Sequence, residues 1–466
     1  MDSLDSLASF DRKWHFDAPC GRISSRMRLS ARVIVPMFLA VLIAAGLLTF
    51  LWLQLHATAR DLRGQATPLT TAAAGTDASA GNIFMDEADK ALLSLRQGDL
   101  LALSGDWAEA QKEYEASVKA GGGIAALKKL VTAQLQRRDL DGARDTIDLL
   151  RREGARSEDL LLLDVLVALR SDRQDEAASL LQEAGDSPQK HYGALLLAVI
   201  QGNHDAAKTE IQAVIGGWEP VLRTYARTLQ GAYDEFLLFP DSPDSHLLTL
   251  LSRALAQVQE CELALPLLAR AVREQDDYRD AWIVQGFCQL TTERSAEALT
   301  SLERAYALDP EKPETQYFLG RAYAAQQDHR NAITFLEYAL QNGFQPERDV
   351  RRAIALEAQA AGDTSLAYHQ YRALATGSGS DLASVQDFVS LALQIDKEED
   401  AYAAAQEAVR QWPNAGKAYA ILGDAAAATG KVDEARTSYE KALQLDATLD
   451  DVKEKLVNLG TASSED

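Results

Sequence analysis

Residue types that could do chemistry are scattered through this chain of 466 residues. Its seven histidines include no pair at the i, i+4 spacing with which a helix can hold a metal ion, and none has a neighbouring cysteine at metal-ligand spacing. After residue 83 the closest two are His191 and His204, which are predicted to lie on successive helices. We therefore expect surface histidines and no metal site.

The catalytic and cofactor-binding motifs with a known physical mechanism are also missing. The one glycine cluster, "AGGGIAAL" at residues 120–127, lacks the Lys and Ser or Thr of a phosphate-binding loop and is typical of a turn between helices. There is no dinucleotide fingerprint, H-E-x-x-H motif or nucleophile elbow. Adjacent carboxylates, such as Glu398 with Glu399, are expected on the solvated surface of a chain with 69 acidic residues. The sequence predicts a protein that is not an enzyme and needs no cofactor.

The charge distribution argues against a nucleic-acid partner. The formal net charge is −22, although residues 1–32 carry six bases against four acids. Binding a phosphate backbone requires clustered Lys and Arg that release counterions, and a strongly acidic surface repels it. The acidic part of the chain is therefore predicted to meet other proteins and not nucleic acid.

One segment is apolar enough to cross a membrane. Residues 33–55, "VIVPMFLAVLIAAGLLTFLWLQL", contain no charged side chain, and as a helix they would exceed a hydrocarbon core of about 30 Å. Arginines crowd the N-terminal side, which favours a cytoplasmic segment over residues 1–32 and a C-terminal part outside the cytoplasm. We predict a single-pass protein of the bacterial inner membrane with its main domain in the periplasm. The alternative is a cleaved signal peptide, because residues 57–59 form an A-x-A site.

Residues 56–82 are small, polar and unpatterned, which predicts a flexible tether. From about residue 83 onward, Ala, Leu, Glu, Gln and Arg dominate, with apolar residues at helical spacing and short turns at Gly or Asp. No stretch alternates as a half-buried strand would. The pattern predicts an all-α domain.

An internal repeat organises this domain. Equivalent alanines recur at separations of 34, 35, 34 and 34 residues: Ala298, Ala332, Ala367, Ala401 and Ala435. Here the sequence resembles the tetratricopeptide repeat family, whose unit of 34 residues is a pair of antiparallel helices. The family pattern has an aromatic residue, Leu, Gly and Tyr in the first helix, then Ala, an aromatic residue and Ala in the second, then Pro. Three units carry it as Trp282, Gly286, Ala298, Leu302, Ala305 and Pro310, with Gln285 and Gln289 as departures; as Leu319, Gly320, Tyr323, Ala332, Leu336 and Ala339; and as Tyr419, Leu422, Gly423, Ala435, Tyr439 and Ala442.

The resemblance covers roughly residues 83–460 and implies a right-handed superhelical solenoid of antiparallel helix pairs. We expect degenerate repeats over 83–216, an irregular helical insert or hinge over 217–245, clear repeats over 246–447, and a capping helix with a tail over 448–466. About ten units fill this length, so no room remains for a catalytic domain.

Two cysteines, Cys261 and Cys288, lie in the predicted repeats. In the frame of the family, Cys261 opens the second helix of one unit and Cys288 lies late in the first helix of the next. Because those helices are antiparallel, the two residues are possible neighbours. They form either a disulfide, which an oxidising compartment favours, or two small buried side chains that never bond.

The resemblance also implies a binding surface, since repeats of this family line a concave groove with the outward faces of their first helices. Arginine pairs bidentately with carboxylates, and aromatic rings supply contact area, which suits a peptide or protein partner with acidic and apolar residues. The alternative is that the aromatic residues pack between first helices while the arginines pair with neighbouring acids. The residues placed on this face are Thr249, Arg253, Ile283, Phe287, Tyr317, Arg321 and Arg352.

These observations predict a membrane-anchored scaffold or adaptor for the assembly of a cell-envelope complex. The first alternative is the substrate-recruiting part of an envelope enzyme, as in glycosyltransferases of repeat architecture. The second is a purely structural protein that associates with itself, although Gly46 has no partner for a G-x-x-x-G dimer motif.

Overall fold

The computed structural model describes residues 86–239, 241–377 and 379–462, which are helical with no strand. The predicted cytoplasmic segment at 1–32, the predicted span at 33–55 and the predicted tether at 56–82 all lie outside these described residues. Among the helices that are described, none has the combined length and apolar character needed to cross a bilayer.

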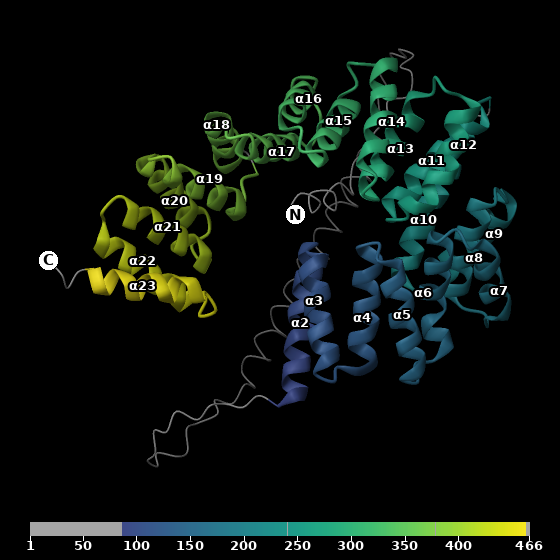
Figure 1. Ribbon diagram of the computed structural model, residues 1–466, viewed down its shortest axis with the longest axis horizontal. Coiled ribbons are helices and arrows are strands. Elements are labelled where there is room, and N and C mark those ends of the chain that lie inside the picture. Colours follow the sequence, from purple (N-terminus) through teal and green to yellow (C-terminus); the bar gives the residue numbers. More distant parts are fainter. Residues whose placement is uncertain (1–85, 240, 378, 463–466) are drawn as a thin grey trace, which may run out of the picture. The chain divides into compact units, whose positions relative to one another are not determined.

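The first described helices form four consecutive pairs followed by one single helix (Figure 1). In each pair the two helices are joined by a short turn and pack along their length, which is how an apolar stripe on each helix becomes buried. The pairs and the single helix are α2 (Glu87–Ser104) with α3 (Trp107–Lys119), α4 (Gly123–Gln136) with α5 (Leu140–Arg152), α6 (Ser157–Arg170) with α7 (Gln174–Glu183), α8 (Pro188–Ile200) with α9 (His204–Gly216), and α10 (Pro220–Leu237).

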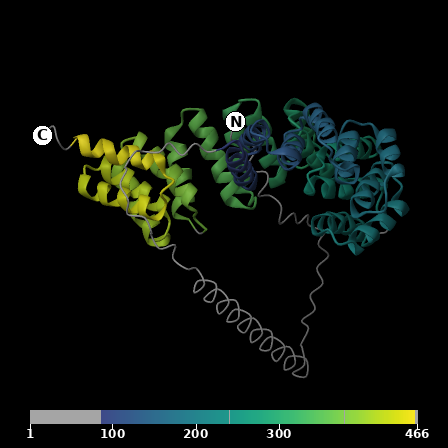
Figure 2. The same cartoon turned by 90° about the horizontal axis from the view of Figure 1, so that it is seen from below.

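Six further pairs and one last helix follow, so the all-α solenoid is confirmed for the described residues. The last helices, yellow in Figures 1 and 2, lie side by side in both views. The elements are α11 (Asp244–Gln257) with α12 (Cys261–Glu274), α13 (Arg279–Thr291) with α14 (Ser295–Leu308), α15 (Pro313–Ala325) with α16 (His329–Gln341), α17 (Glu347–Ala360) with α18 (Thr364–Thr376), α19 (Leu382–Gln394) with α20 (Glu398–Gln411), α21 (Gly416–Ala428) with α22 (Val432–Leu445), and α23 (Asp450–Ala462).

The turn within each described pair contains one residue in the left-handed backbone region. In the six later pairs these residues recur at separations of 34, 34, 35, 34 and 34, and only two of them are glycines. A left-handed conformation is unfavourable for a residue with a Cβ atom, so the turn geometry is imposed by the packing of the two helices. The left-handed residues are Gly105, Arg138, Asp172 and Gly202 in the earlier pairs, and Gln259, Glu293, Gln327, Gly362, Asp396 and Gly430 in the later ones.

Close approach within a pair depends on the small residues of the repeat pattern. A Cβ atom placed on Gly286 would lie 2.4 Å from Cγ of Leu302, and one on Gly423 would lie 2.4 Å from Cδ1 of Tyr439. The alanines that define the period are fully buried, among them Ala298 and Ala435. The repeat motif therefore sets the distance between the helices of a pair and fixes the side of the first helix that faces outward.

Candidate interaction surface

Three of the residues predicted to line a groove are buried. Thr249, Ile283 and Tyr317 are 4%, 0% and 0% exposed. The Thr249 hydroxyl donates to the carbonyl of Ser245 at 2.7 Å, and the Tyr317 ring stacks on Phe344 with centroids 4.2 Å apart. The prediction that these three side chains are available to a partner is wrong, because neighbouring side chains cover them.

Two more of the predicted residues make contacts along the array. Phe287 is partly buried and lies against Phe318 of the next first helix, with centroids 5.3 Å apart. Arg253 forms an ion pair with Glu235 of α10. These contacts follow the alternative interpretation, in which aromatic residues pack between first helices and arginines pair with neighbouring acids.

The last two predicted residues, Arg321 and Arg352, belong to a group of charged and polar residues that we call the arginine cluster. It lies on three successive first helices, α15, α17 and α19, and also contains Arg348, which the sequence analysis missed. Arg348 lies one helical turn before Arg352, so the i, i+4 spacing in the sequence was a usable signal. The arginine cluster consists of Arg321, Arg348, Asp349, Arg352, Asp381, Ser384 and Asp387.

Arg348 and Arg352 converge on the N-terminus of α19. Nη2 of Arg348 donates to Oδ2 of Asp381 at 2.9 Å and to Oγ of Ser384 at 3.0 Å, and Nη1 donates to the carbonyl of Leu374 at 3.0 Å. Nη2 of Arg352 donates to the same Ser384 hydroxyl at 2.9 Å and lies 3.6 Å from Asp381. Oδ1 of Asp381 accepts from the backbone N–H of Ser384 at 2.7 Å, so this carboxylate also caps the helix.

The acids of the arginine cluster have shifted pKa values. Burial raises the pKa of Asp349, and the charges of Arg352, Arg321 and Arg348 only partly offset this effect. Oδ2 of Asp349 is buried and has no hydrogen-bond partner among the described residues. For Asp381 burial acts in the same direction, but the hydrogen bonds from Ser384 and the two arginine charges outweigh it, so its pKa is lowered. The cluster therefore holds one well-compensated carboxylate and one that lacks a donor.

An apolar side chain continues this surface along α17. Leu356 lies one turn beyond Arg352 and two turns beyond Arg348, so the three residues share one face of the helix. Leu356 is 41% exposed, so it offers apolar surface to solvent. Cationic and apolar groups therefore stand next to each other on an accessible first helix.

A buried ion pair joins parts of the chain that are 90 residues apart. The guanidinium of Arg170 on α6 donates to both carboxylate oxygens of Glu260, at 2.8 and 3.0 Å, and to the carbonyl of Leu135 at 2.9 Å. Both side chains are at most 5% exposed. Burial raises the pKa of Glu260, and the bidentate contact with Arg170 opposes this shift. The ion pair fixes α6 against the turn that precedes α12.

Cys261 and Cys288 are buried neighbours at the same junction. Burial, together with a hydrogen bond from the Cys288 S–H to Cys261, raises the pKa of the Cys288 thiol well above its ordinary value. Both are free thiols in the structure, which matches the second of the two alternatives, two buried side chains that do not bond. Because the two thiols are neighbours, a disulfide between them in the oxidised protein stays a prediction. Thiol labelling of denatured, unreduced protein tests it, since neither cysteine reacts if the bond exists in the cell.

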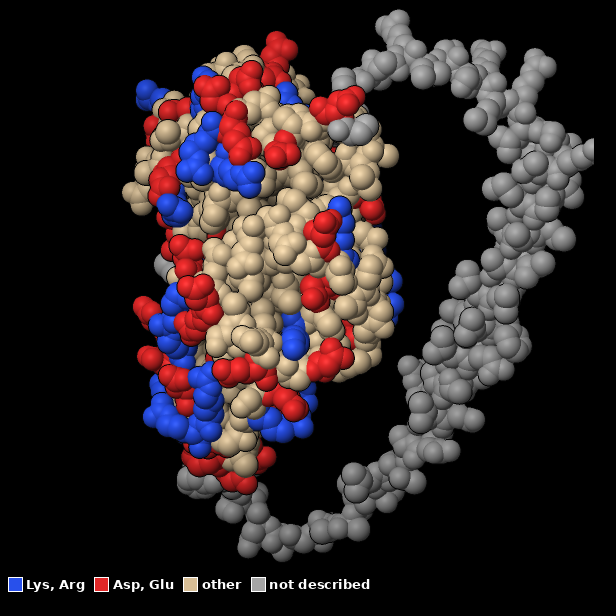
Figure 3. All heavy atoms as spheres, turned by 90° about the vertical axis from the view of Figure 1, so that its right-hand side faces the viewer, with Lys and Arg blue, Asp and Glu red and all other residues tan. Residues whose placement is uncertain are grey.

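The charged surface is mixed on the face seen in Figure 3. Acidic and basic side chains alternate there around a broad area without charged residues, and no continuous basic stripe crosses it. On this face, a mixed pattern is unlike the basic footprint of a nucleic-acid-binding protein.

Comparison with known proteins identifies the repeats. A family model described as tetratricopeptide repeat matches residues 249–313, 289–345 and 387–450. Residues 249–345 and 387–450 are therefore similar to tetratricopeptide repeats. The matched residues run from α11 to α16 and from α19 to the start of α23, and they include Arg321 of the arginine cluster together with Asp387. A comparison with curated proteins found no match.

Several solved structures of repeat proteins are similar at low identity. YrrB, described as a tetratricopeptide repeat protein with an unusual peptide-binding site, is 16% identical over 40% of this chain and 96% of its own, with a TM-score of 0.35. PilW, described as a widely conserved type IV pilus biogenesis factor, is 14% identical over 46% and 99%, with a TM-score of 0.36. Yeast Tom70 is 12% identical over 82% and 97%, with a TM-score of 0.30. Similarity at these scores supports no conclusion about the partner of this chain.

Proposed function

We propose that this tetratricopeptide repeat protein is an interaction scaffold whose arginine cluster binds an acidic and apolar segment of a partner protein. The observation that carries the proposal is the row of Arg348, Arg352 and Leu356 on one accessible face of α17. Arginine is suited to carboxylate recognition because its planar fork forms two parallel hydrogen bonds.

The proposed binding step is an exchange of carboxylates. The side chain of Asp381 is 52% exposed, so its ion pairs with Arg348 and Arg352 are partly solvated and of low stability. A partner carboxylate can replace it at little cost. The neighbouring Leu356 then contacts an apolar side chain of the same segment.

The proposal includes an anchor in the bacterial inner membrane through residues 33–55, with the N-terminus cytoplasmic and the repeats in the periplasm. The uncharged run of 23 residues and the arginines before it support this topology. A flexible tether of the length of residues 56–82 has an r.m.s. extension of about 30 Å. From that position the scaffold would take part in assembling a complex of the cell envelope.

Photocrosslinking in cells tests the binding surface. A photoreactive amino acid at Leu356 is expected to capture a discrete partner, and Arg348→Glu together with Arg352→Glu is expected to abolish the adduct. The matched control carries the photoreactive group at Tyr338 of α16, a second helix, where the side chain is 42% exposed. Equal capture from both positions, or capture that survives the double substitution, would place the binding surface elsewhere.

Reporter fusions after Thr58 and at the C-terminus test the topology separately. Reporters that are active only outside the cytoplasm should work at both positions. Activity of a cytoplasmic reporter alone at these two positions would overturn the proposed localisation without affecting the arginine cluster.

A further inference from the structure

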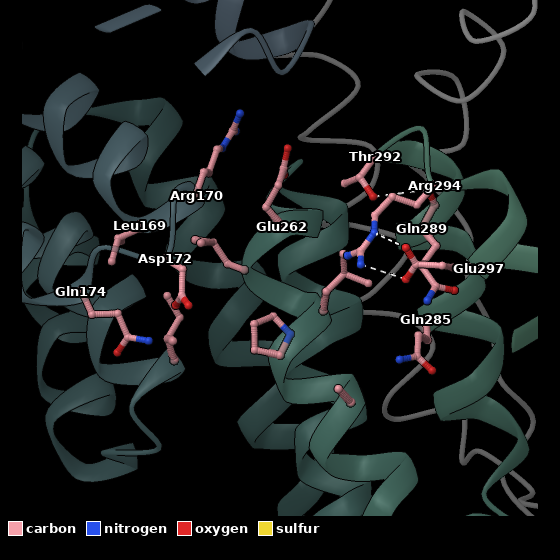
Figure 4. A pocket seen from close by; sticks show the side chains of 15 residues that line it. Leu169, Arg170, Asp172, Gln174, Glu262, Gln285, Gln289, Thr292, Arg294 and Glu297 are labelled. Atoms are coloured by element: carbon pink, nitrogen blue, oxygen red, sulfur yellow. Dashed lines mark hydrogen bonds and ion pairs between the residues drawn. The ribbon is translucent and has the colours of Figure 1, made fainter. Parts of the chain in front are cut away.

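A second candidate site lies where α6, α7 and α8 meet α12 and α13. It is a pocket of about 440 Å³, within the range of roughly 300–1,000 Å³ that is usual for ligand sites. In Figure 4, Asp172 and Gln174 lie on one side of it and Gln285 and Gln289 on the other. We call it the glutamine pocket, and the residues of its lining that matter here are Asp172, Gln174, Glu262, Pro266, Gln285 and Gln289.

Two of these residues are the departures from the repeat pattern. The pattern has Leu and Tyr where this unit has Gln285 and Gln289, and the next unit has Leu319 and Tyr323. Gln285 is only 8% exposed, and its Oε1 atom has no hydrogen-bond partner among the described residues. A buried amide without a partner costs about 1–3 kcal/mol of stability compared with a satisfied one. Packing therefore gives no reason for this glutamine.

The neighbouring glutamine is held in place. Oε1 of Gln289 accepts a hydrogen bond from the buried Ser301 hydroxyl at 2.7 Å. This contact defines the orientation of the amide group next to Gln285, one helical turn away on α13. The polar wall of the pocket is thus built by packed side chains of α13 and α14.

The charged groups of the lining leave an excess of acceptors. Arg170 is committed to Glu260, and Arg294 pairs with Glu297 at 2.8 Å. Glu262 lies 3.0 Å from Nε of Arg138, yet neither of its carboxylate oxygens takes part in a well-formed hydrogen bond within the described part of the chain. Asp172 is exposed, and none of the ion pairs found among the described residues includes it.

We propose that the glutamine pocket binds a lysine or arginine side chain of a partner protein. The ammonium or guanidinium group donates to Oε1 of Gln285 and is attracted by Asp172 and Glu262, while its methylene stem lies along Pro266. The net charge of −22 raises the local concentration of such cationic segments. This site goes beyond the proposed function, because it lies on different helices from the arginine cluster and prefers the opposite charge.

The test uses the full-length chain and a fluorescent peptide, acetyl-(Gly-Lys)3-amide, whose binding is followed by fluorescence polarisation at low ionic strength. Gln285→Leu restores the residue type of the repeat pattern without changing the charge. It is expected to weaken binding at least tenfold while the melting temperature stays equal or rises, because an unpaired carbonyl is removed. Asp172→Asn removes the charge, and Asn adopts the left-handed backbone conformation of this position as readily as Asp does. This substitution is expected to weaken binding several-fold.

The matched control is Asp396→Asn, which removes the same charge from a residue with the same left-handed conformation in the turn before α20. It is expected to leave the affinity unchanged. A peptide with norleucine in place of lysine should not bind. Unchanged affinity in Gln285→Leu, or an equal loss in Asp396→Asn, would overturn the proposal, since either result means non-specific attraction to an acidic surface. Tighter binding of spermidine than of the lysine peptide would also overturn it, by assigning the pocket to a free polyamine.

Discussion

The arginine cluster and the glutamine pocket solve the problem of recognition in opposite ways. In the cluster, Arg348 and Arg352 already have acceptors: the partly exposed carboxylate of Asp381, which a partner can displace, and the buried hydroxyl of Ser384. In the pocket, Oε1 of Gln285 is an acceptor that lacks a donor, and Glu262 has an ion-pair contact with Arg138 but no well-formed hydrogen bond among the described residues. The arginines of the cluster keep their ion pairs without a partner, although Oδ2 of Asp349 lacks a donor there, whereas the polar wall of the pocket is less stable until a donor reaches Gln285.

The two regions also differ in their relation to the repeat pattern. The arginines occupy outward positions of first helices, which the pattern leaves open. The glutamines occupy positions that the pattern reserves for apolar packing. Substitutions should therefore separate the two regions: changes in the pocket affect stability and binding together, and changes in the cluster affect mainly binding.

The largest effect is expected from breaking the buried ion pair behind the pocket. Arg170→Met leaves Glu260 buried and unpaired, which should lower the free energy of local unfolding of α6 to α12 by about 3–5 kcal/mol. Hydrogen exchange, which resolves individual helices of a repeat array, measures this loss. Helices α17 to α19 should keep their protection, because they do not contact this pair.

The control for that substitution is Arg410→Met, which breaks an exposed pair with Glu407 and should leave the free energy of unfolding almost unchanged. Replacing both Arg170 and Glu260 by Met is expected to recover much of the loss. Equal destabilisation by the Arg170 and Arg410 substitutions would show that burial of the pair is unimportant.

A smaller effect is expected from adding one methyl group within a helix pair. Gly286→Ala crowds Leu302 and should cost about 1–3 kcal/mol while it moves Gln285 and weakens the lysine peptide. Gly320→Ala crowds Leu336 at 2.6 Å and should cost a similar amount while it moves Arg321. Denaturation and peptide binding measured on both variants check this assignment. If both substitutions weaken binding of the lysine peptide, the assignment of Gly286 to the pocket and of Gly320 to the cluster is wrong.

Removal of one cluster charge should change stability only slightly. The Arg352 side chain is 37% exposed, so Arg352→Gln should lower the free energy of unfolding by less than about 1 kcal/mol while weakening an acidic partner. Chemical denaturation beside a binding titration separates the two effects. A loss of several kcal/mol would mean that the arginine is a packing residue and not an exchangeable contact.

The smallest effect is expected in the pH dependence of the free energy of unfolding, through two histidines next to α10. Burial lowers the pKa of His204 and of His246, whose Nδ1 atoms contact Tyr233 and Tyr278 at 3.1 and 2.7 Å. The folded state therefore resists protonation, so this contribution to stability is present above about pH 6.5 and is lost as the pH falls below it. Replacing both histidines by Gln should flatten the pH dependence between 7 and 5 relative to the parent. An unchanged slope of the free energy of unfolding against pH would show that these two histidines do not cause the loss of stability.

The sequence predicted the helix pairs well because their determinants are local. Ala298, Gly286 and Leu302 recur with the period of the unit, and each acts within its own pair of helices. The same pattern predicted the outward face of each first helix, but it does not say which side chains the neighbouring unit covers. Tyr317 is buried because Phe344, beyond the end of the next helix, stacks on it.

The candidate sites were only partly predictable for a related reason. Arg352 was found from the repeat frame and Arg348 was missed, although the spacing of the two in the sequence was visible. Gln285 and Gln289 were noticed as departures, but their pocket requires α6 beside α12, and that contact depends on the pair Arg170 and Glu260, 90 residues apart. No local pattern encodes such a long-range contact.

The opposite charge preference of the two surfaces is tested most directly with two peptides on one protein. Acetyl-(Leu-Glu)3-amide and acetyl-(Gly-Lys)3-amide, carrying different fluorophores, are titrated together against the full-length chain and its variants. We expect Arg348→Glu with Arg352→Glu to abolish binding of the acidic peptide alone, and Gln285→Leu to abolish binding of the basic peptide alone. Loss of both peptides in either variant, or of neither in both, would contradict it.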